Sequence, residues 1–393
     1  MPERIMKKND FPKKALNKIK RVRDCIYFND PDRPAIQDMF IWDDFIKNWK
    51  KHFCLDKEAD IHKYYDFDLV CCSPNIDPVI ENVKELERCE NYVIYRGGFG
   101  SILRLDFSQP VPGFIDYAIK DMSQLKAFRF EDPHDNRRYE NSFALTDQFA
   151  KTDSFEIQLE KYSDSFCIFG NICEARETVW RMMGIEGELV AIMDYTRELA
   201  DFAERAAEFN IELGRMQLAD ENISGLLIYG DVAYSNGLFM SPLSWRKIYK
   251  PALAEICYQL KKFGKPLVYH TDGSYLDVLD DLIEIGIDAT HPNEAKAGVD
   301  AVKLRSRYGK RIAFLANIDA TVLSESRQNI KQELEYKLQA AGKFSAQKRP
   351  ASEGDELWKS GGFIPGGDDI PSSVSPENYD YYINLLKKIT GSN

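Results

Sequence analysis

Long apolar runs are missing from this sequence. No stretch approaches the ~18 consecutive apolar residues of a membrane-spanning helix, and the N-terminus has no apolar signal core. Paired cysteine spacing is missing too, because none of the eight cysteines stands in a CxxC or zinc-ribbon pair. We therefore expect a cytoplasmic protein with reduced thiols, which neither spans a membrane nor is exported.

An excess of positive charge is also absent. The 52 Lys and Arg residues face 63 Asp and Glu residues, which gives a formal net charge of −11. Such a chain repels polyanions, so we expect no nucleic-acid partner. No phosphate loop is recognisable, because Gly97–Gly100 is followed by no Lys-Ser/Thr pair and has no GxGxxG spacing. We interpret this glycine stretch as a hairpin turn.

Short apolar runs alternate with helical stretches, most regularly from Phe155 onward. The hydrophobic fraction of 44% is enough to fill a sizeable core. The runs that we expect to be strands are 67–73, 92–95, 166–169, 225–229, 266–269, 287–290, 312–316 and 362–365. Eight strands with helices between them predict an α/β fold with parallel pairing, a single (β/α)8 TIM barrel. A doubly wound open sheet is the alternative.

We expect one domain over residues 1–393, because no linker divides the chain. Residues 1–60 are predicted to form an N-terminal helical extension that packs on the barrel. Within it, residues 38–52 have the pattern of one amphipathic helix whose aromatic side chains belong to the core. The polar stretch 343–360, which Pro and Gly interrupt, is predicted to be a mobile surface loop.

Polar side chains follow most of the predicted strands at their C-terminal ends. They are Asp231, His270, Asp272, His291, Asn293, Glu294, Asn317, Asp319, Asp368 and Asp369. Because the C-terminal ends of barrel strands meet at one mouth, we expect these groups to lie close together. Imidazoles and carboxylates suit a divalent metal such as zinc, acid–base chemistry or a polar substrate. Taken singly, Asp231 and Asp272 are equally typical of turns, and Asp319 of a helix cap.

Several motifs follow one another through the C-terminal half of the chain. They include Gly230-Asp231, Met240-Ser241-Pro242, His270-Thr-Asp272-Gly273, His291-Pro292-Asn-Glu294, Ala316-Asn317-Ile318-Asp319 and Gly361-Gly362-Phe-Ile-Pro365. In this order they resemble the uroporphyrinogen decarboxylase superfamily, which includes the corrinoid-linked methyltransferases.

Departures from the superfamily's patterns indicate the branch. Uroporphyrinogen decarboxylase itself carries an N-terminal Arg-Gln-Ala-Gly-Arg motif, which is absent here. Methylcobamide:coenzyme M methyltransferases bind zinc through His-x-Cys-Gly and a later cysteine. This chain has Asp272 in place of the first cysteine and Asp368 or Asp369 near the second. Its His-Thr-Asp-Gly string is similar to that of O-demethylase-like members, which are thought to move a methyl group from a methoxylated compound to a corrinoid protein.

The resemblance implies a methyltransferase that takes a methyl group from a methoxylated, or otherwise methylated, small molecule. The implied acceptor is the cobalt of a corrinoid that a partner protein carries. The catalytic residues are expected to be His270, Asp272 and Asp231. The expected ligands of zinc or another divalent metal are His270, Asp272, Glu294 and Asp368. The expected substrate contacts are Asp231, His291, Asn293, Asn317 and Asp319.

Two other functions stay open at this point. One is decarboxylation of a porphyrinogen or a smaller acid in porphyrin metabolism, with Asp231 or Asp272 holding pyrrole N–H groups. The other is a non-catalytic barrel that binds a tetrapyrrole or a corrinoid partner. The sequence predicts no oligomeric state.

Overall fold

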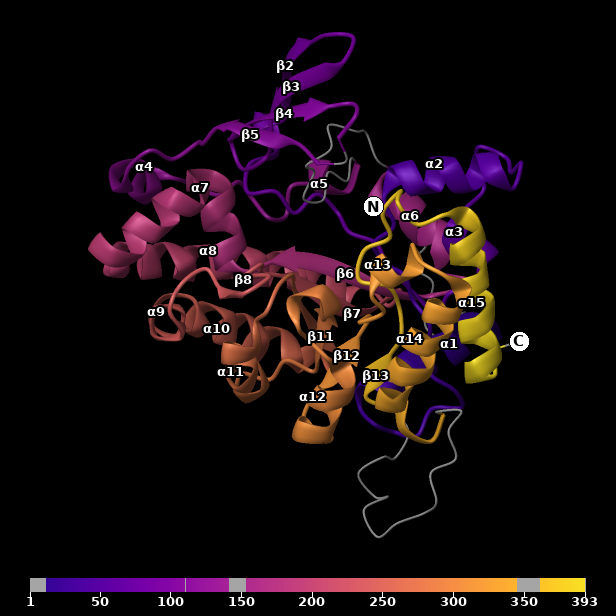
Figure 1. Ribbon diagram of the computed structural model, residues 1–393. Coiled ribbons are helices and arrows are strands. Elements are labelled where there is room, and N and C mark those ends of the chain that lie inside the picture. The colour runs from indigo at the N-terminus through magenta and orange to yellow at the C-terminus, as the bar shows by residue number, and fades with distance from the viewer. Residues whose placement is uncertain (1–11, 110, 141–152, 345–360, 393) are drawn as a thin grey trace.

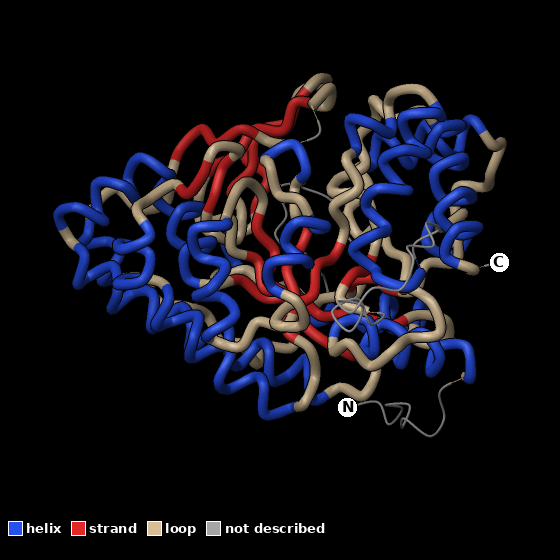
Figure 2. Tube along the Cα trace, turned by 60° about the horizontal axis from the view of Figure 1, so that its bottom comes forward, coloured by secondary structure: helices blue, strands red, loops and turns tan. Residues whose placement is uncertain are grey.

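A seven-stranded parallel sheet forms the centre of the protein, which a computed structural model describes over residues 12–109, 111–140, 153–344 and 361–392 (Figures 1 and 2). Its strands lie in the order β1 (Leu69–Cys71), β6 (Cys167–Cys173), β7 (Ile223–Tyr229), β10 (Leu267–Thr271), β11 (Ala289–Pro292), β12 (Ala313–Leu315) and β13 (Phe363–Ile364). Among these described strands the order never reverses. The doubly wound alternative is therefore wrong, because such a sheet changes direction at a switch point.

An irregular segment, residues 35–42, joins the two edges of this sheet. The Asp68 N–H donates to the Ile36 carbonyl at 2.8 Å, and the Gln37 N–H donates to the Pro365 carbonyl at 3.2 Å. This segment is not a strand, so the parallel sheet has seven strands and not the eight that were predicted. The α/β fold with parallel strands is confirmed, and the closed eight-stranded barrel is not. The helix expected over 38–52 begins only at Asp43. The residues before this helix do not join it, because their backbone groups form hydrogen bonds with the two edges of the sheet instead.

The predicted barrel strand 92–95 lies instead in a separate antiparallel sheet, so that prediction was wrong. This sheet contains β2 (Lys84–Arg88), β3 (Tyr92–Arg96), β4 (Ile102–Asp106) and β5 (Gly113–Asp116), and it stands at the top of Figure 1. Buried and more exposed side chains alternate along β3, which is typical of an antiparallel sheet with one wet face. The hairpin turn expected at Gly97–Gly100 is confirmed, because it connects β3 to β4.

Helices surround the parallel sheet, most of them on its outside (Figure 2). In chain order they are α1 (Lys13–Ile26), α2 (Asp43–His52), α3 (Ile61–Tyr64), α4 (Met122–Ala127), α5 (Arg137–Glu140), α6 (Phe155–Tyr162), α7 (Ala175–Asp194), α8 (Thr196–Ala219), α9 (Pro242–Ile248), α10 (Lys250–Leu260), α11 (Leu279–Glu284), α12 (Ala301–Tyr308), α13 (Ala320–Leu323), α14 (Arg327–Lys337) and α15 (Pro376–Thr390). A short hairpin, β8 (Ala233–Tyr234) and β9 (Gly237–Leu238), follows β7. Most of the predicted loop 343–360 lies outside the described residues.

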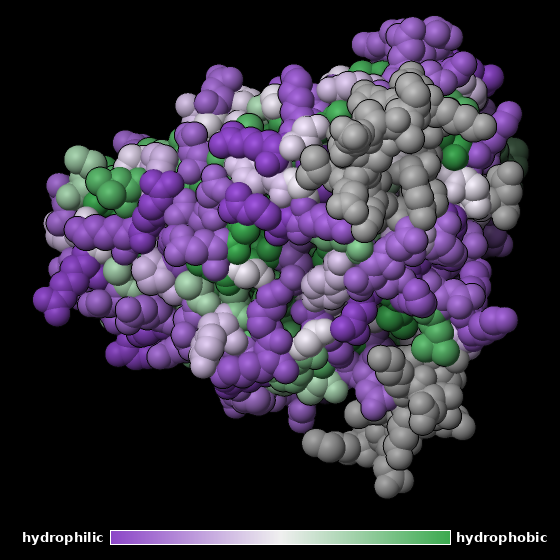
Figure 3. Space-filling view, turned by 90° about the horizontal axis from the view of Figure 1, so that it is seen from below, coloured by the Kyte–Doolittle hydropathy of each residue, from purple (hydrophilic) through white to green (hydrophobic). Residues whose placement is uncertain are grey.

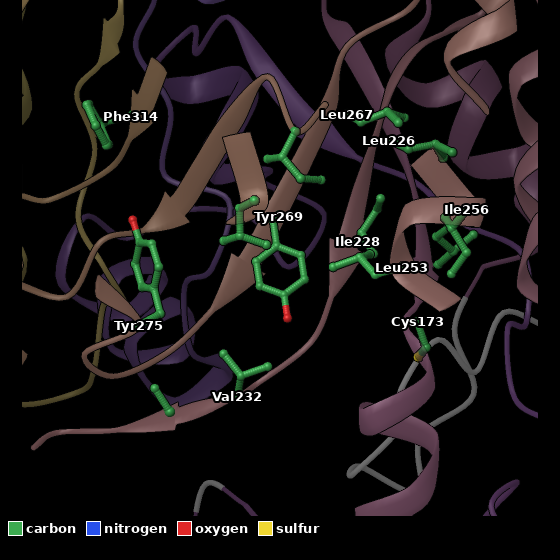
Figure 4. Close-up of a cluster of buried hydrophobic side chains, with 14 of the residues drawn as sticks. Cys173, Leu226, Ile228, Val232, Leu253, Ile256, Leu267, Tyr269, Tyr275 and Phe314 are labelled. Carbon is green, nitrogen blue, oxygen red and sulfur yellow. The ribbon is translucent and has the colours of Figure 1, made fainter. Parts of the chain in front are cut away.

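The strand side chains divide into an outer and an inner set. Outward-pointing residues pack under the helices, and Figure 4 shows Leu226 and Ile228 of β7 beside Leu253 and Ile256 of α10. Successive strand residues point to opposite faces, so the residue between the first two, Leu227, points inward. None of the described helices is both long and apolar enough to cross a membrane. Hydrophilic side chains cover most of the face seen in Figure 3.

The inside of the curled sheet is filled in layers along the strands. Helix α1 supplies Val22 and Ile26 to a buried cluster that includes Val268 of β10 and Ala289 of β11. Two residues further along these strands the same inward face carries His270 and His291. The alternation of the strands therefore delivers both imidazoles to the layer nearest the C-terminal mouth.

Candidate functional site

A cleft of about 610 Å³ opens at the C-terminal mouth of the parallel sheet. Its lining comes from residues 39–47, from the β4–β5 hairpin and from strand ends: Met39, Phe40, Ile41, Trp42, Asp43, Asp44, Lys47, Leu105, Phe107, Gln109, Val111, His270, Asp272 and Asp369. Pockets of this size accept small organic molecules. The antiparallel sheet, which the sequence did not predict, thus forms one wall of the cleft.

Three of the predicted residues meet at the base of the cleft: His270 and Asp272 line it, and Asp231 lies next to them outside its lining. One candidate ligand atom from each of Asp231, His270 and Asp272 lies within 4.8 Å of the other two. The Asp272 N–H donates to Asp231 Oδ1 at 3.0 Å, and His270 Nε2 lies 3.8 Å from Asp272 Oδ1. An imidazole nitrogen with hard carboxylate oxygens suits zinc and other divalent cations, so this set fits a metal site.

A glycine fixes the turn that carries Asp272. Gly273 has φ +77°, and a Cβ there would lie 2.5 Å from the backbone oxygen of Tyr234. Its N–H donates to Glu294 Oε2 at 2.8 Å, while Glu294 Oε1 pairs with Lys296 at 2.8 Å. Glu294, a predicted metal ligand, is therefore held beside Asp272 by its own partners.

The two adjacent acids after β13 have different positions. Asp368 is buried, and its Oδ1 accepts the N–H groups of Ala320 at 3.1 Å and Asp369 at 3.0 Å. Its Oδ2 has no hydrogen-bond partner among the described residues. Asp369 lines the cleft, whereas the predicted ligand Asp368 does not belong to its lining.

Burial makes the carboxyl groups of the cleft weak acids. It raises the pKa of Asp231 to about 7, with Glu177 and Asp272 adding to the effect. It also raises the pKa of Asp272 to about 7, and that of Asp369 to about 8, with further contributions from neighbouring acids. Carboxyl groups in this range either release protons to a bound cation or give them to a substrate near neutral pH.

Glu177 is a site residue that the sequence analysis missed. It lies in the first turn of α7 and is buried, and it accepts the Asp231 N–H at 3.3 Å. Trp180 Nε1 donates to it at 2.8 Å and Arg181 Nε at 2.7 Å. Although burial opposes ionisation, these partners lower the pKa of Glu177 overall. No sequence motif indicates Glu177, because its place in the site depends on the position at which α7 begins.

The two histidines lie side by side inside the curled sheet. Their Nδ1 atoms are 2.9 Å apart, and their rings stack with centroids 5.1 Å apart. Phe40 covers both rings, at centroid distances of 5.1 Å from His270 and 5.3 Å from His291. His291 is fully buried and does not line the cleft. Phe40 was predicted to be a core residue of a helix, and in the structure it lies in the irregular segment.

The other predicted substrate contacts have partners within the protein. Asn293 is fully buried and donates to the carbonyls of Thr290 and Leu315. Asn317 is also fully buried, and Asp319 caps α13 by accepting the Thr321 N–H at 2.9 Å. None of Asn293, Asn317 and Asp319 lines the cleft.

Comparisons with known proteins agree with this fold. The family model for uroporphyrinogen decarboxylase (URO-D) matches residues 152–349, just over half of the chain. No curated protein matches. Among solved structures, a methyltransferase from Methanosarcina mazei is similar, with a TM-score of 0.61 and 15% identity over 94% of this chain and 98% of that one. At this identity the likeness establishes a common fold.

Proposed function

We propose that this chain, which belongs to the uroporphyrinogen decarboxylase family, moves a methyl group from a methoxylated or otherwise methylated small molecule to a corrinoid carried by a separate protein. The predicted family is thus confirmed, and the methyltransfer is our proposal. The observation on which it rests most is the meeting of Asp231, His270 and Asp272 on the floor of an acidic cleft.

We assign the floor of the cleft to a divalent metal. His270 and Asp272 would hold it together with Asp231, and the charges of Glu294 and Asp368 act on Asp272 from nearby. A metal bound to such ligands acts as a Lewis acid toward a substrate oxygen. The aspartates that stand where methylcobamide:coenzyme M methyltransferases have cysteines suit this role, because hard oxygen ligands leave zinc more electrophilic than thiolates do.

The residues of the chain supply the proton that the leaving oxygen needs. As the methyl carbon bonds to the acceptor cobalt, its bond to oxygen breaks and the electron pair stays on oxygen. That oxygen then takes one proton. Asp369 is suited to donate it, because it lines the cleft, is not one of the assigned metal ligands, and has its pKa raised to about 8 by burial. Asp231 instead fixes the ligand Asp272, because its Oδ1 accepts the Asp272 N–H.

The lining of the cleft favours this reaction over decarboxylation of a porphyrinogen. The cleft is lined by four aspartates, Asp43, Asp44, Asp272 and Asp369, and by a single cation, Lys47, with no arginine among the described lining residues. A substrate with many carboxylates would be repelled. Phe40, Trp42 and Phe107 instead offer aromatic faces to a flat methoxylated ring.

A methyl-transfer assay tests the proposal. The full chain, loaded with Zn²⁺, is incubated with a panel of methoxyaromatic compounds and a reduced corrinoid, and methylated corrinoid is followed by absorbance. We expect transfer, and a loss of about 100-fold in the Asp369→Asn variant, which removes the proposed proton donor. The matched control, Asp280→Asn, changes an exposed acid on α11 and should keep wild-type activity. Absence of transfer across the panel, with turnover of uroporphyrinogen instead, would overturn the assignment.

A further inference from the structure

His291 is paired with His270 by the register of the sheet. Strands β10 and β11 are parallel neighbours in which His270 stands opposite His291. The pair is enclosed, because Phe40 covers both rings and Tyr229 contacts the His270 ring at a centroid distance of 5.0 Å. The geometry therefore holds one imidazole against the other with little freedom to rotate.

The two Nδ1 atoms lie 2.9 Å apart, so one proton is shared between them in a hydrogen bond. One Nδ1 must donate and the other must accept. A neutral imidazole ring carries one proton, on either of its two nitrogens. Two arrangements are then possible. In the first, His270 donates its Nδ1–H to His291 and its own Nε2 has no proton. In the second, His291 donates its Nδ1–H and His270 has its proton on Nε2.

We propose that His291 is a positioning residue that accepts the His270 Nδ1–H and so leaves His270 Nε2 bare toward Asp272 and Asp231 for a divalent cation. The inference rests on the metal site of the proposed function. It gives His291 a task other than the substrate contact that the sequence suggested.

The arrangement follows a general requirement of metal sites. A histidine that binds a metal through one ring nitrogen donates its other N–H to a fixed acceptor, which sets the tautomer and the ring orientation. Here that acceptor is a second imidazole. His291 Nε2 then carries the proton, and it has no hydrogen-bond partner among the described residues. The protein tolerates this buried, unpaired group because the other ring nitrogen is needed as an acceptor.

Zinc titration and nitrogen-15 histidine spectra of the full chain test the inference. With five histidines in the sequence, single variants are enough to assign every ring. In the zinc-loaded protein we expect His270 to be protonated on Nδ1 and His291 on Nε2. His291→Phe, which keeps a ring but removes the acceptor, should weaken zinc binding by about 10–100-fold. His291→Asn keeps an oxygen near the Nδ1 position and should restore most of the affinity.

The control is His62→Phe, which removes an imidazole that pairs with Asp60 outside the cleft lining and should leave zinc affinity unchanged. Equal zinc affinity in wild type and His291→Phe, or a zinc-loaded spectrum with the His291 proton on Nδ1, would overturn the inference. Either result leaves methyl transfer by the wild-type protein intact. A wild type that binds zinc but transfers no methyl group refutes the proposed function alone, and one that binds no zinc refutes this inference.

Discussion

Asp272 shows at the scale of one residue how burial prepares a carboxyl group for chemistry. It follows the last residue of β10, so the strand directs it into the cleft, while burial and the neighbouring acid Glu294 make its ionisation costly. A cation at this point relieves that cost. The raised pKa of Asp272 and its position at the mouth therefore have the same structural origin.

Zinc affinity should depend on pH through these acids. Burial raises the pKa of Asp231 and of Asp272 to about 7, and a carboxyl group must lose its proton before it binds a cation. Below pH 7 we expect the zinc affinity to rise with pH, by up to about tenfold per pH unit for each proton that binding releases. Above pH 8 it should level off. Calorimetry in two buffers of different ionisation enthalpy measures the affinity and the protons released. A constant affinity from pH 6 to 8 would refute this prediction.

The site residues at the ends of strands could be predicted from the sequence. A short apolar run that stops at a polar residue is visible without a structure, and Asp231, His270 and Asp272 all follow such runs. Glu177 and Phe40 lack a comparable pattern. Their positions depend on where α7 starts and on an irregular segment, and both of these are set by tertiary hydrogen bonds.

At the scale of an element, the turn after β10 depends on Gly273. An Ala there would meet the Tyr234 backbone and would adopt a left-handed φ, so we expect Gly273→Ala to lower the free energy of unfolding by about 3 kcal/mol or more. Gly298→Ala is the matched control, because Gly298 has φ +80° but nothing within 4 Å of its Cβ position. It should cost about 1–2 kcal/mol of backbone strain. Urea unfolding measures both variants, and equal losses would contradict the steric argument.

The segment that joins the sheet edges is held by a buried acid. Asp38 is fully buried and accepts the Tyr379 hydroxyl at 2.6 Å and the Gly367 N–H at 2.5 Å. Burial raises its pKa from 3.8 to about 6. Between these values the unfolded chain loses a proton that the folded protein keeps, so the contribution of Asp38 to stability falls as pH rises through this window.

Asp38→Asn should remove this dependence. The difference in unfolding free energy between wild type and variant should therefore shift by roughly 2 kcal/mol between pH 4 and pH 6, to the disadvantage of the wild type at the higher pH. Urea unfolding at four pH values measures it. A difference that stays constant over this range would show that Asp38 titrates normally in the folded protein.

The sequence predicted the elements of the parallel sheet better than the elements around its edges. Buried strands such as β10 are continuous apolar runs, which are distinctive. The strand at 92–95 is equally apolar in composition, and only its partners show that it belongs to another sheet. Likewise, the apolar spacing of residues 38–42 suits a helix, and hydrogen bonds from distant strand edges decide otherwise.

At the scale of the whole molecule, the acidic mouth should select substrates by charge. Asp43 and Asp44 supply most of the negative charge of the lining, because Asp369 has its pKa raised to about 8 and Asp272 is assigned to the metal. A neutral methoxylated amide should therefore be used more efficiently than the matching carboxylate, by about twofold in kcat/KM at low salt. The gap should shrink at 0.5 M salt, because exposed charges are screened. Replacing Asp43 and Asp44 by Asn should shrink it as well. A preference for the carboxylate would contradict the argument.

The central claim is that segments far apart in the chain build one cation site on the floor of the cleft. Crystals grown with Zn²⁺ and measured on both sides of the zinc absorption edge test it most directly. We predict an anomalous peak bonded to His270 Nε2 and to oxygens of Asp231 and Asp272. A zinc-soaked crystal with no peak there, or with His270 Nε2 turned away from both carboxylates, would contradict the account.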